Sequence, residues 1–251
     1  MGHIPAKKLL PEISFVTCVS NWHTYKENVL ASLHNTKSDE RLFECIPIDN
    51  VSNRLSAAQA LNKGLDQSRA NFVVFCHQDI IFPPEWTSCL FKSIEEIEQS
   101  FSVWGVIGFA GRCADGSHSG HVLEPRGEYF HPPMPKQVQT VDECCMVVKK
   151  ESSLRFDESF THFHLYGSDL CLSAIYRGMP CYTVDCCLEH LSRGNKSREW
   201  HNEKEKLIKK WWPKRKRVGN KVYTTSGSIR LHSPVVRTLR QIRNKVKTKC
   251  L

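Results

Sequence analysis

A short apolar run followed at once by polar residues constrains the fold of this 251-residue chain more than any other feature. Residues 72–76 read FVVFC, and His77, Gln78 and Asp79 follow them directly. A continuous apolar run of this kind is typical of a central strand that is buried on both faces of a parallel sheet. Because open α/β sheets bind ligands at the carboxyl ends of their strands, the sequence predicts a ligand site that includes Asp79.

The residues before this run alternate between strand and helix patterns. Strands are predicted at residues 13–19 and 43–48, and helices at residues 25–33 and 55–65, where apolar residues recur at spacings of three and four. This alternation favours right-handed crossovers and a mainly parallel sheet with helices on both faces. The predicted fold class is therefore α/β, with a Rossmann-like nucleotide-binding half.

Two common phosphate-binding motifs are absent from the sequence. No G-x-G-x-x-G follows the first predicted strand, and no G-x-x-x-x-G-K-[ST] occurs, which disfavours a dinucleotide cofactor and a P-loop triphosphate. A divalent cation held by Asp79 would bind a diphosphate in another way. Mg²⁺ and Mn²⁺ bind through one or two protein groups and complete their shells with phosphate oxygens and water.

Two later segments offer further polar side chains. Asp169 lies in a Gly-Ser-Asp turn that opens a predicted helix, and it is a candidate general base, with a plain N-cap as the alternative. His190 lies in a polar loop after a short strand at residues 181–184 and could complete a metal site with Asp79, with a structural histidine as the alternative. His77 stays open between a metal ligand, a donor contact and a residue at the edge of the core. A Gly-, Ser- and His-rich stretch at residues 108–121 is expected to be a mobile loop, either an acceptor-side lid or a surface connection.

Three segments, in this order and spacing, resemble glycosyltransferase family 2 and its glycosyltransferase-like relatives with the GT-A fold. The segments are PIDN, SAAQALNKGLDQSRANFVVFCHQDIIFPPEW and VDECCMVVKKESSLRFDESFTHFHLYGSDLCLSAIYRGMPCYTVDCCLEHLSRG, and the resemblance covers roughly residues 12–194. It implies transfer of a sugar from a nucleotide-diphosphate donor to an acceptor hydroxyl, usually with inversion, assisted by Mn²⁺ or Mg²⁺. The expected partners are thus a nucleotide-sugar donor and a glycan or lipid-linked acceptor, in the synthesis of a glycan or cell-surface polysaccharide.

The resemblance also implies roles for single residues. Asp79 matches the last carboxylate of the family's D-x-D type motif, Asp169 the aspartate that serves as catalytic base, and His190 the metal-binding histidine of the last core strand. The implied metal ligands are therefore Asp79 and His190. The expected donor-binding residues are Ser20, Asn21, Asp49, His77, Gln78 and Asp79.

The sequence departs from the family pattern at two positions. His77 stands at the first position of the D-x-D type motif, and Ser168 precedes Asp169 where the family has an acid. These departures keep open a catalytically silent GT-A domain that is used for binding.

Basic residues concentrate towards the end of the sequence. Residues 193–251 contain 19 Lys and Arg against 3 Glu, a net charge of +16, which leaves residues 1–192 at about −7. We interpret residues 1–192 as the GT-A-like catalytic domain and residues 193–251 as a basic C-terminal extension. Within it, apolar residues at helical spacing between residues 235 and 246 predict a basic amphipathic helix.

The extension raises the question of a surface partner. Residues 209–251 could bind an anionic membrane peripherally, where each cation adds about 1 kcal/mol, or pack on the catalytic domain with a solvated basic face. A nucleic-acid-binding protein is a further alternative, but it leaves the acidic body unexplained and is the less favoured reading. No run approaches the roughly 18–20 apolar residues of a membrane span, and no apolar export signal begins the chain. The sequence therefore predicts a cytoplasmic protein, with peripheral contact to the inner face of a membrane as an option.

Overall fold

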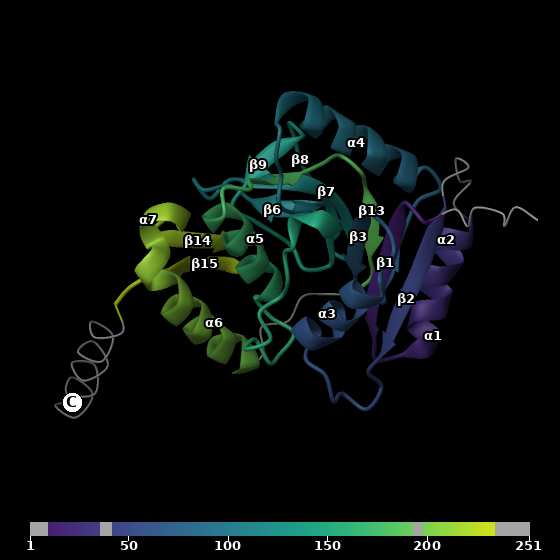
Figure 1. Ribbon diagram of the computed structural model, residues 1–251, viewed down its shortest axis with the longest axis horizontal. Helices are drawn as coiled ribbons and strands as arrows, with labels where there is room; N and C mark the ends of the chain where they lie inside the picture. Colours follow the sequence, from purple (N-terminus) through teal and green to yellow (C-terminus); the bar gives the residue numbers. More distant parts are fainter. Residues whose placement is uncertain (1–9, 36–41, 193–197, 234–251) are drawn as a thin grey trace, which may run out of the picture.

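The protein folds into two mixed β-sheets, a small hairpin and surrounding helices (Figure 1). The computed structural model describes residues 10–35, 42–192 and 198–233. The predicted amphipathic helix at residues 235–246 lies outside the described residues.

The central sheet has seven strands, and the first three along the chain were predicted from the sequence. Its strands are, in spatial order, β2 (Phe43–Asp49), β1 (Ile13–Val19), β3 (Phe72–Cys76), β11 (Cys145–Lys149), β5 (Ile107–Gly108), β12 (Cys181–Thr183) and β9 (Lys136–Val138). β1 pairs in parallel with β2 and β3, so all three end at the same edge of the sheet. Parallel pairing holds in three of the six strand pairs, whereas the sequence had predicted a mainly parallel sheet.

The strand β11 is responsible for most of this difference. It runs antiparallel to both of its neighbours, β3 and β5. Its amino end therefore lies beside the carboxyl end of β3, with Cys145 opposite Cys76. Residues that precede β11 consequently reach the same edge of the sheet as residues that follow β3.

A second sheet lies next to this edge. Its main path is β10 (Thr140–Val141), β6 (Ala110–Arg112), β7 (His118–Glu124), β13 (Leu188–His190) and β4 (Ile80–Ile81), and β8 (Gly127–His131) pairs with the free side of β7. The stretch at residues 108–121, which we expected to be a mobile loop, contributes β6 and the first half of β7. Cross-strand backbone bonds such as the pairing of Gly111 with Ser119 hold it in the sheet.

Helices cover the central sheet on both faces, because alternate side chains of a strand point to opposite sides. On one face, Phe15 of β1 shares a core with α1 (Trp22–Tyr25), η1 (Lys26–Leu30), α2 (Ala31–Asn35) and α4 (Trp86–Ser100). On the other face, Val16 of β1 shares a core with α3 (Ala57–Gln67) and α5 (Tyr166–Tyr176). The helix predicted at residues 25–33 is thus part of a longer helical segment, and α3 begins two residues later than predicted because Ser56 caps it.

The described part of the basic extension packs against α5. It consists of α6 (Arg198–Trp211), η3 (Trp212–Lys214), α7 (Arg215–Val218) and the hairpin of β14 (Lys221–Thr224) and β15 (Gly227–Arg230), on the side of the molecule opposite α1 and α2 (Figure 1). Leu207, Trp211, Val222 and Ile229 belong to the same hydrophobic core as α3 and α5. The net charge of the chain therefore changes after residue 192, but the residues described on both sides of that point share one hydrophobic core. Among the described residues, no helix is both long and apolar enough to span a membrane.

The packing of α3 on β1 depends on a glycine. A Cβ added to Gly64 would lie 2.1 Å from Cγ1 of Val16, whose side chain is fully buried. We expect Gly64→Ala to lower the free energy of unfolding by about 1–3 kcal/mol, despite the higher helix propensity of alanine, because a filled core does not accept an extra methyl group. Urea denaturation followed by circular dichroism measures this loss. Lys63→Ala, at an exposed position of the same helix, should change stability by less than about 0.5 kcal/mol, and an equal effect of both substitutions would contradict the prediction.

Candidate functional site

A cavity opens where β1 and β3 end, at the edge that the sequence had indicated. Its volume is about 210 Å³, and His77, Gln78 and Asp79 lie in its wall together with Ser20 from the end of β1. The remaining lining residues are Cys18, Ala57, Leu61, Phe75, Cys76, Glu143, Phe163 and Tyr166. Polar groups therefore converge on a partly apolar cavity, which is the usual composition of a ligand site.

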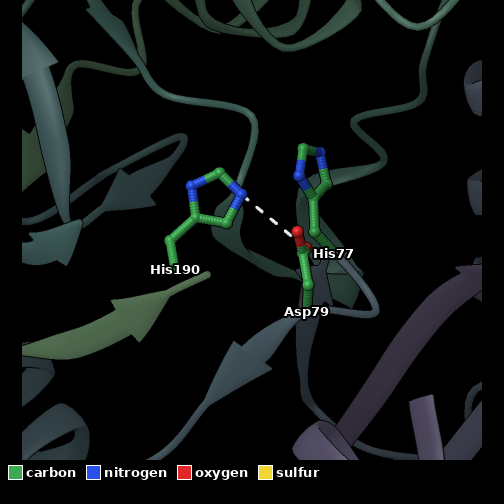
Figure 2. A group of neighbouring side chains, drawn as sticks. All are labelled: His77, Asp79 and His190. Atoms are coloured by element: carbon green, nitrogen blue, oxygen red, sulfur yellow. Dashed lines mark ion pairs between the residues drawn. The ribbon is translucent and has the colours of Figure 1, made fainter. Parts of the chain in front are cut away.

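Three side chains in or beside this cavity form a potential metal site, and they point toward one another in Figure 2. His77, Asp79 and His190 each offer one ligand atom, and these atoms all lie within 4.8 Å of one another. The distance from Nε2 of His190 to Oδ1 of Asp79 is 3.7 Å. Two ligand atoms that each lie about 2.1 Å from one ion are at most about 4.2 Å apart, so this pair can share a cation after little adjustment. The structure thus brings together Asp79 and His190, the two predicted metal ligands, and adds His77.

The second sheet positions His190. His190 is the last residue of β13 and pairs with Ile80 of β4, which begins directly after Asp79. The backbone N–H of Leu191 also donates to the carbonyl oxygen of Asp79 over 3.1 Å. His190 therefore lies at a strand end, whereas we had expected it in a loop beyond the sheet.

The protonation state of His77 suits a metal ligand. Burial, followed by the nearby His190, lowers the pKa of His77, so its imidazole is neutral at neutral pH and keeps a lone pair. One ring nitrogen of His77, Nε2, lies 3.2 Å from the hydroxyl of Tyr166. Two imidazoles and one carboxylate form a donor set that favours a first-row transition ion such as Mn²⁺ over Mg²⁺, which prefers oxygen ligands.

The other predicted donor-binding residues lie beside this cluster. Oε1 of Gln78 accepts hydrogen bonds from the backbone N–H groups of Ser20 (3.0 Å) and Asn21 (2.9 Å), which ties the end of β3 to the end of β1. The side chain of Asn21 caps α1 and is occupied there. Asp49 accepts a hydrogen bond of 3.1 Å from the indole Nε1 of Trp22. Asn21 and Asp49 are not among the residues that line the cavity.

Asp169 is placed differently from what the sequence suggested. Its carboxylate is fully buried and accepts one hydrogen bond from Nζ of Lys210 and one from Nε1 of Trp211, each 2.7 Å long. Nζ of Lys210 also donates a hydrogen bond to Asp157. Burial raises the pKa of Asp157, but the hydrogen bond from Lys210 outweighs this effect together with smaller contributions and lowers the pKa to about 2. Asp169 therefore joins α5 to α6 and does not line the cavity at the strand ends. Its partners lie more than 40 residues along the chain, so no local pattern could have indicated this role.

Glu143 is the site residue that the sequence analysis missed. It lies two residues ahead of β11, lines the cavity, and accepts a 2.9 Å hydrogen bond from the backbone N–H of Gly167 at the start of α5. Burial, followed by the charge of Asp142, raises the pKa of Glu143 to about 8. The signal was an acidic residue next to a buried strand. In a parallel sheet the residues ahead of a strand lie at the edge away from such a site, whereas β11 is antiparallel and brings Glu143 to it.

The burial of Asp169 leads to a prediction about stability. Asp169→Asn removes the charge that faces Lys210 inside the protein, and we expect it to lower the free energy of unfolding by about 2–4 kcal/mol, because breaking a buried pair leaves the other group poorly compensated. Thermal and urea unfolding measure the loss. Asp66→Asn, at an exposed ion pair with Arg155, is the matched control and should change stability by less than about 1 kcal/mol. Equal stability of Asp169→Asn and the wild type would show that the contact to α6 is dispensable.

Three solved structures resemble this chain at low sequence identity. The structure of GalNAc-T7 with UDP, GalNAc and Mn²⁺ has a TM-score of 0.60 and 12% identity, over 82% of this chain and 50% of that one. Residues 1–349 of TarS from S. aureus give 0.52 and 12%, over 78% and 64% of the two chains. The mannosyltransferase PcManGT from Pyrobaculum calidifontis, in complex with GDP-Man and Mn²⁺, gives 0.51 and 12%, over 82% and 63%. These likenesses show the fold, that of GT-A glycosyltransferases, and this chain spans less than two thirds of each of those proteins.

Sequence comparison adds one curated relative and a family. The relative is "ATP synthase subunits region ORF 6" of Fuscovulum blasticum, 27% identical over 166 residues, which are 60% of this chain and 65% of that protein. The sequence model of the glycosyltransferase-like family matches residues 14–223, a span that contains the strand ends, the His77–Asp79–His190 cluster, α5 and α6. By that match over most of its length, the chain belongs to the glycosyltransferase-like family.

Proposed function

We propose that this protein transfers a sugar from a nucleotide-diphosphate donor to an acceptor hydroxyl, with inversion at the anomeric carbon. The observation that carries the proposal is the His77–Asp79–His190 cluster, which lies at a cavity formed by the ends of β1 and β3. Carboxyl ends of parallel strands are where α/β sheets bind nucleotides, and a cation there offsets the charge of a diphosphate.

The nucleoside of the donor would lie at the end of β1. Asp49 is positioned by Trp22, whose indole is 37% exposed and offers a flat face beside the carboxylate. A purine or pyrimidine can stack on such a face while a carboxylate accepts hydrogen bonds from base or ribose. Hydrogen bonds among Ser20, Asn21 and Gln78 connect this end of the site to the His77–Asp79–His190 cluster. GalNAc-T7, TarS and PcManGT, solved with UDP, UDP-GlcNAc and GDP-Man respectively, support a nucleotide-sugar as the donor class.

The residues of the chain would bind and orient the donor before the transfer. His77, Asp79 and His190 would hold Mn²⁺, or Mg²⁺ with lower affinity, and the bound cation would stabilise negative charge on the leaving diphosphate. Gln78 fixes the loop after β1 against the end of β3, so the nucleoside and diphosphate ends of the site keep a constant separation. Phe75 and Cys76 are buried and give the cavity an apolar part of its wall.

The acceptor would be a glycan or a lipid-linked glycan in the synthesis of a cell-surface polysaccharide. The basic extension supports contact with an anionic membrane surface through residues 209–251, of which residues 209–233 are described. Lys209, Lys216 and Arg217 are exposed there. The guanidinium of Arg215 lies 3.5 Å from the ring centre of Trp212, so part of this charge is held next to an aromatic group suited to the headgroup region. The protein would then work at the inner face of a membrane.

Donor binding is the first prediction of the proposed function. A panel of UDP-, GDP- and dTDP-sugars should contain at least one member that raises the melting temperature in the presence of Mn²⁺ and is slowly hydrolysed, because ligands that bind only the folded state stabilise it. Differential scanning fluorimetry and detection of the released nucleoside diphosphate measure both effects. Binding without any turnover would instead favour a catalytically silent binding domain, and no response to any donor would refute the proposal.

Metal binding is the second prediction. We expect Asp79→Asn and His190→Ala each to weaken Mn²⁺ binding at least tenfold, because each removes one of the few protein ligands to the ion. Titration of free Mn²⁺ by electron paramagnetic resonance, with and without UDP and GDP, measures the affinity. His34→Gln, on the exposed end of α2, is the control and should bind Mn²⁺ as the wild type does. Undiminished binding in both cluster variants would place the cation elsewhere.

A further inference from the structure

We propose that Glu143 is the general base of the transfer, taking the proton from the attacking hydroxyl group. This inference rests on the proposed function and assigns a role that the sequence pattern had given to Asp169.

Glu143 lies between the donor cavity and a second, polar cavity. The second cavity has a volume of about 40 Å³, which is enough for a water molecule or a hydroxyl group. Its polar lining comes from the residues ahead of β11, the residues at and just before the start of α5, and the β14–β15 hairpin: Asp142, Glu143, His164, Ser168, Thr224, Thr225 and Ser226. Of the residues that the structure describes, Glu143 alone belongs to the linings of both cavities. A hydroxyl that enters from the polar side therefore meets Glu143 before it meets the donor.

The start of α5 holds the Glu143 carboxylate in one orientation. Oε1 accepts the 2.9 Å hydrogen bond from the N–H of Gly167. A Cβ at position 167 would lie 2.7 Å from Cγ of Glu143, so only glycine leaves room for this side chain. Leu165, the N-cap residue just before α5, has a φ of +62°, a conformation that costs energy for a non-glycine residue and is often kept at functional sites.

The first turn of α5 connects Glu143 to the His77–Asp79–His190 cluster. Tyr166, next to Gly167, has its hydroxyl 3.2 Å from Nε2 of His77. On the strand side, the N–H of His77 donates 2.9 Å to the carbonyl oxygen of Cys144, the neighbour of Glu143. The base and the cluster are thus joined through both α5 and β11, which fixes their relative positions.

The environment of Glu143 suits proton transfer at neutral pH. Burial and the charge of Asp142 raise its pKa to about 8, while the backbone N–H groups of Gly167, Ser168 and Leu165 act in the opposite direction. A base whose pKa lies near the working pH accepts a proton efficiently, and a cation in the neighbouring cluster favours the ionised form. Asp169, by contrast, already accepts hydrogen bonds on both oxygens, from Lys210 and Trp211.

The bonds that form and break in the proposed transfer involve only Glu143, the acceptor hydroxyl and the donor. The Glu143 carboxylate takes the proton of the acceptor O–H, and the oxygen forms a bond to the anomeric carbon of the donor sugar. The bond between that carbon and the diphosphate oxygen breaks, and its electron pair leaves with the nucleoside diphosphate. The products are the glycoside, the nucleoside diphosphate and a protonated Glu143, which returns its proton to solvent. Water follows the same path in donor hydrolysis.

Donor hydrolysis therefore tests the inference without knowledge of the acceptor. The probe is the donor from the UDP-, GDP- and dTDP-sugar panel that binds the wild type with Mn²⁺. We expect Glu143→Gln to keep the dissociation constant of this donor within about threefold and to reduce the hydrolysis rate by about 10²- to 10⁴-fold, because the amide accepts no proton. Glu151→Gln is the matched control, since Glu151 is exposed on η2 (Lys150–Ser152) at the far end of β11, and it should hydrolyse the donor at the wild-type rate.

A second variant guards against misfolding of the first. Gly167→Ala leaves the carboxylate of Glu143 intact but displaces it, and we expect reduced hydrolysis with retained donor binding. Hydrolysis by Glu143→Gln above one tenth of the wild-type rate would overturn the inference and leave the proposed function standing. Loss of donor binding in Glu143→Gln would also overturn it, by assigning Glu143 to the donor. Turnover kept in Glu143→Gln but lost in an Asp169→Asn variant that stays folded and binds the donor would assign the base to Asp169. A wild type that binds no donor would overturn the proposed function together with this inference.

Discussion

The antiparallel pairing of β11 with β3 is the constraint on which the site depends. It brings the amino end of one buried strand to the carboxyl end of another, with Cys145 opposite Cys76. Next to that pair, the backbone N–H of His77 donates to the carbonyl oxygen of Cys144, and the N–H of Gly167 in α5 donates to the Glu143 side chain, so His77 and Glu143 lie at the same edge. In a wholly parallel sheet the residues ahead of β11 would lie at the opposite edge. Glu143 would then be absent from the cavity, and the sheet would contribute polar groups only from the carboxyl ends of its strands.

What the sequence could predict follows from how local each signal is. The run at residues 72–76 and the helical spacing in α3 are patterns within one element, and the fold class, the three parallel strands and the importance of Asp79 follow from them. The placement of Asp169 depends on contacts with Lys210 and Trp211, which lie far along the chain. The placement of Glu143 depends on the direction of β11, which no pattern near Glu143 indicates. The pairing of His190 with Ile80 likewise depends on a register across more than 100 residues, so the sequence indicated the residue but placed it in a loop.

The basic extension shows how composition and packing give different information. Counted as charge, residues 193–251 separate from the acidic body, but Lys210 bonds two carboxylates of that body, and Lys214 lies 4.9 Å from the ring centre of Trp211. Part of the positive charge therefore stabilises the contact between α5 and α6. Cations on exposed positions such as Lys216 remain for a surface partner.

The β14–β15 hairpin gives the site a dependence on the order of synthesis. Its turn lines the polar cavity beside Glu143, and the hydroxyl of Thr225 donates to Asp142, a residue that leaves the ribosome 83 residues earlier. The strands that carry the His77–Asp79–His190 cluster can therefore pair before the hairpin side of the polar cavity has been synthesised. A nascent or proteolytically shortened chain that lacks the hairpin would expose Asp142 and Glu143 to bulk water, whereas the cavity at the ends of β1 and β3 takes no lining residue from the hairpin. Under the proposed function, the donor side of the site can therefore form earlier in the life of the chain than the acceptor side.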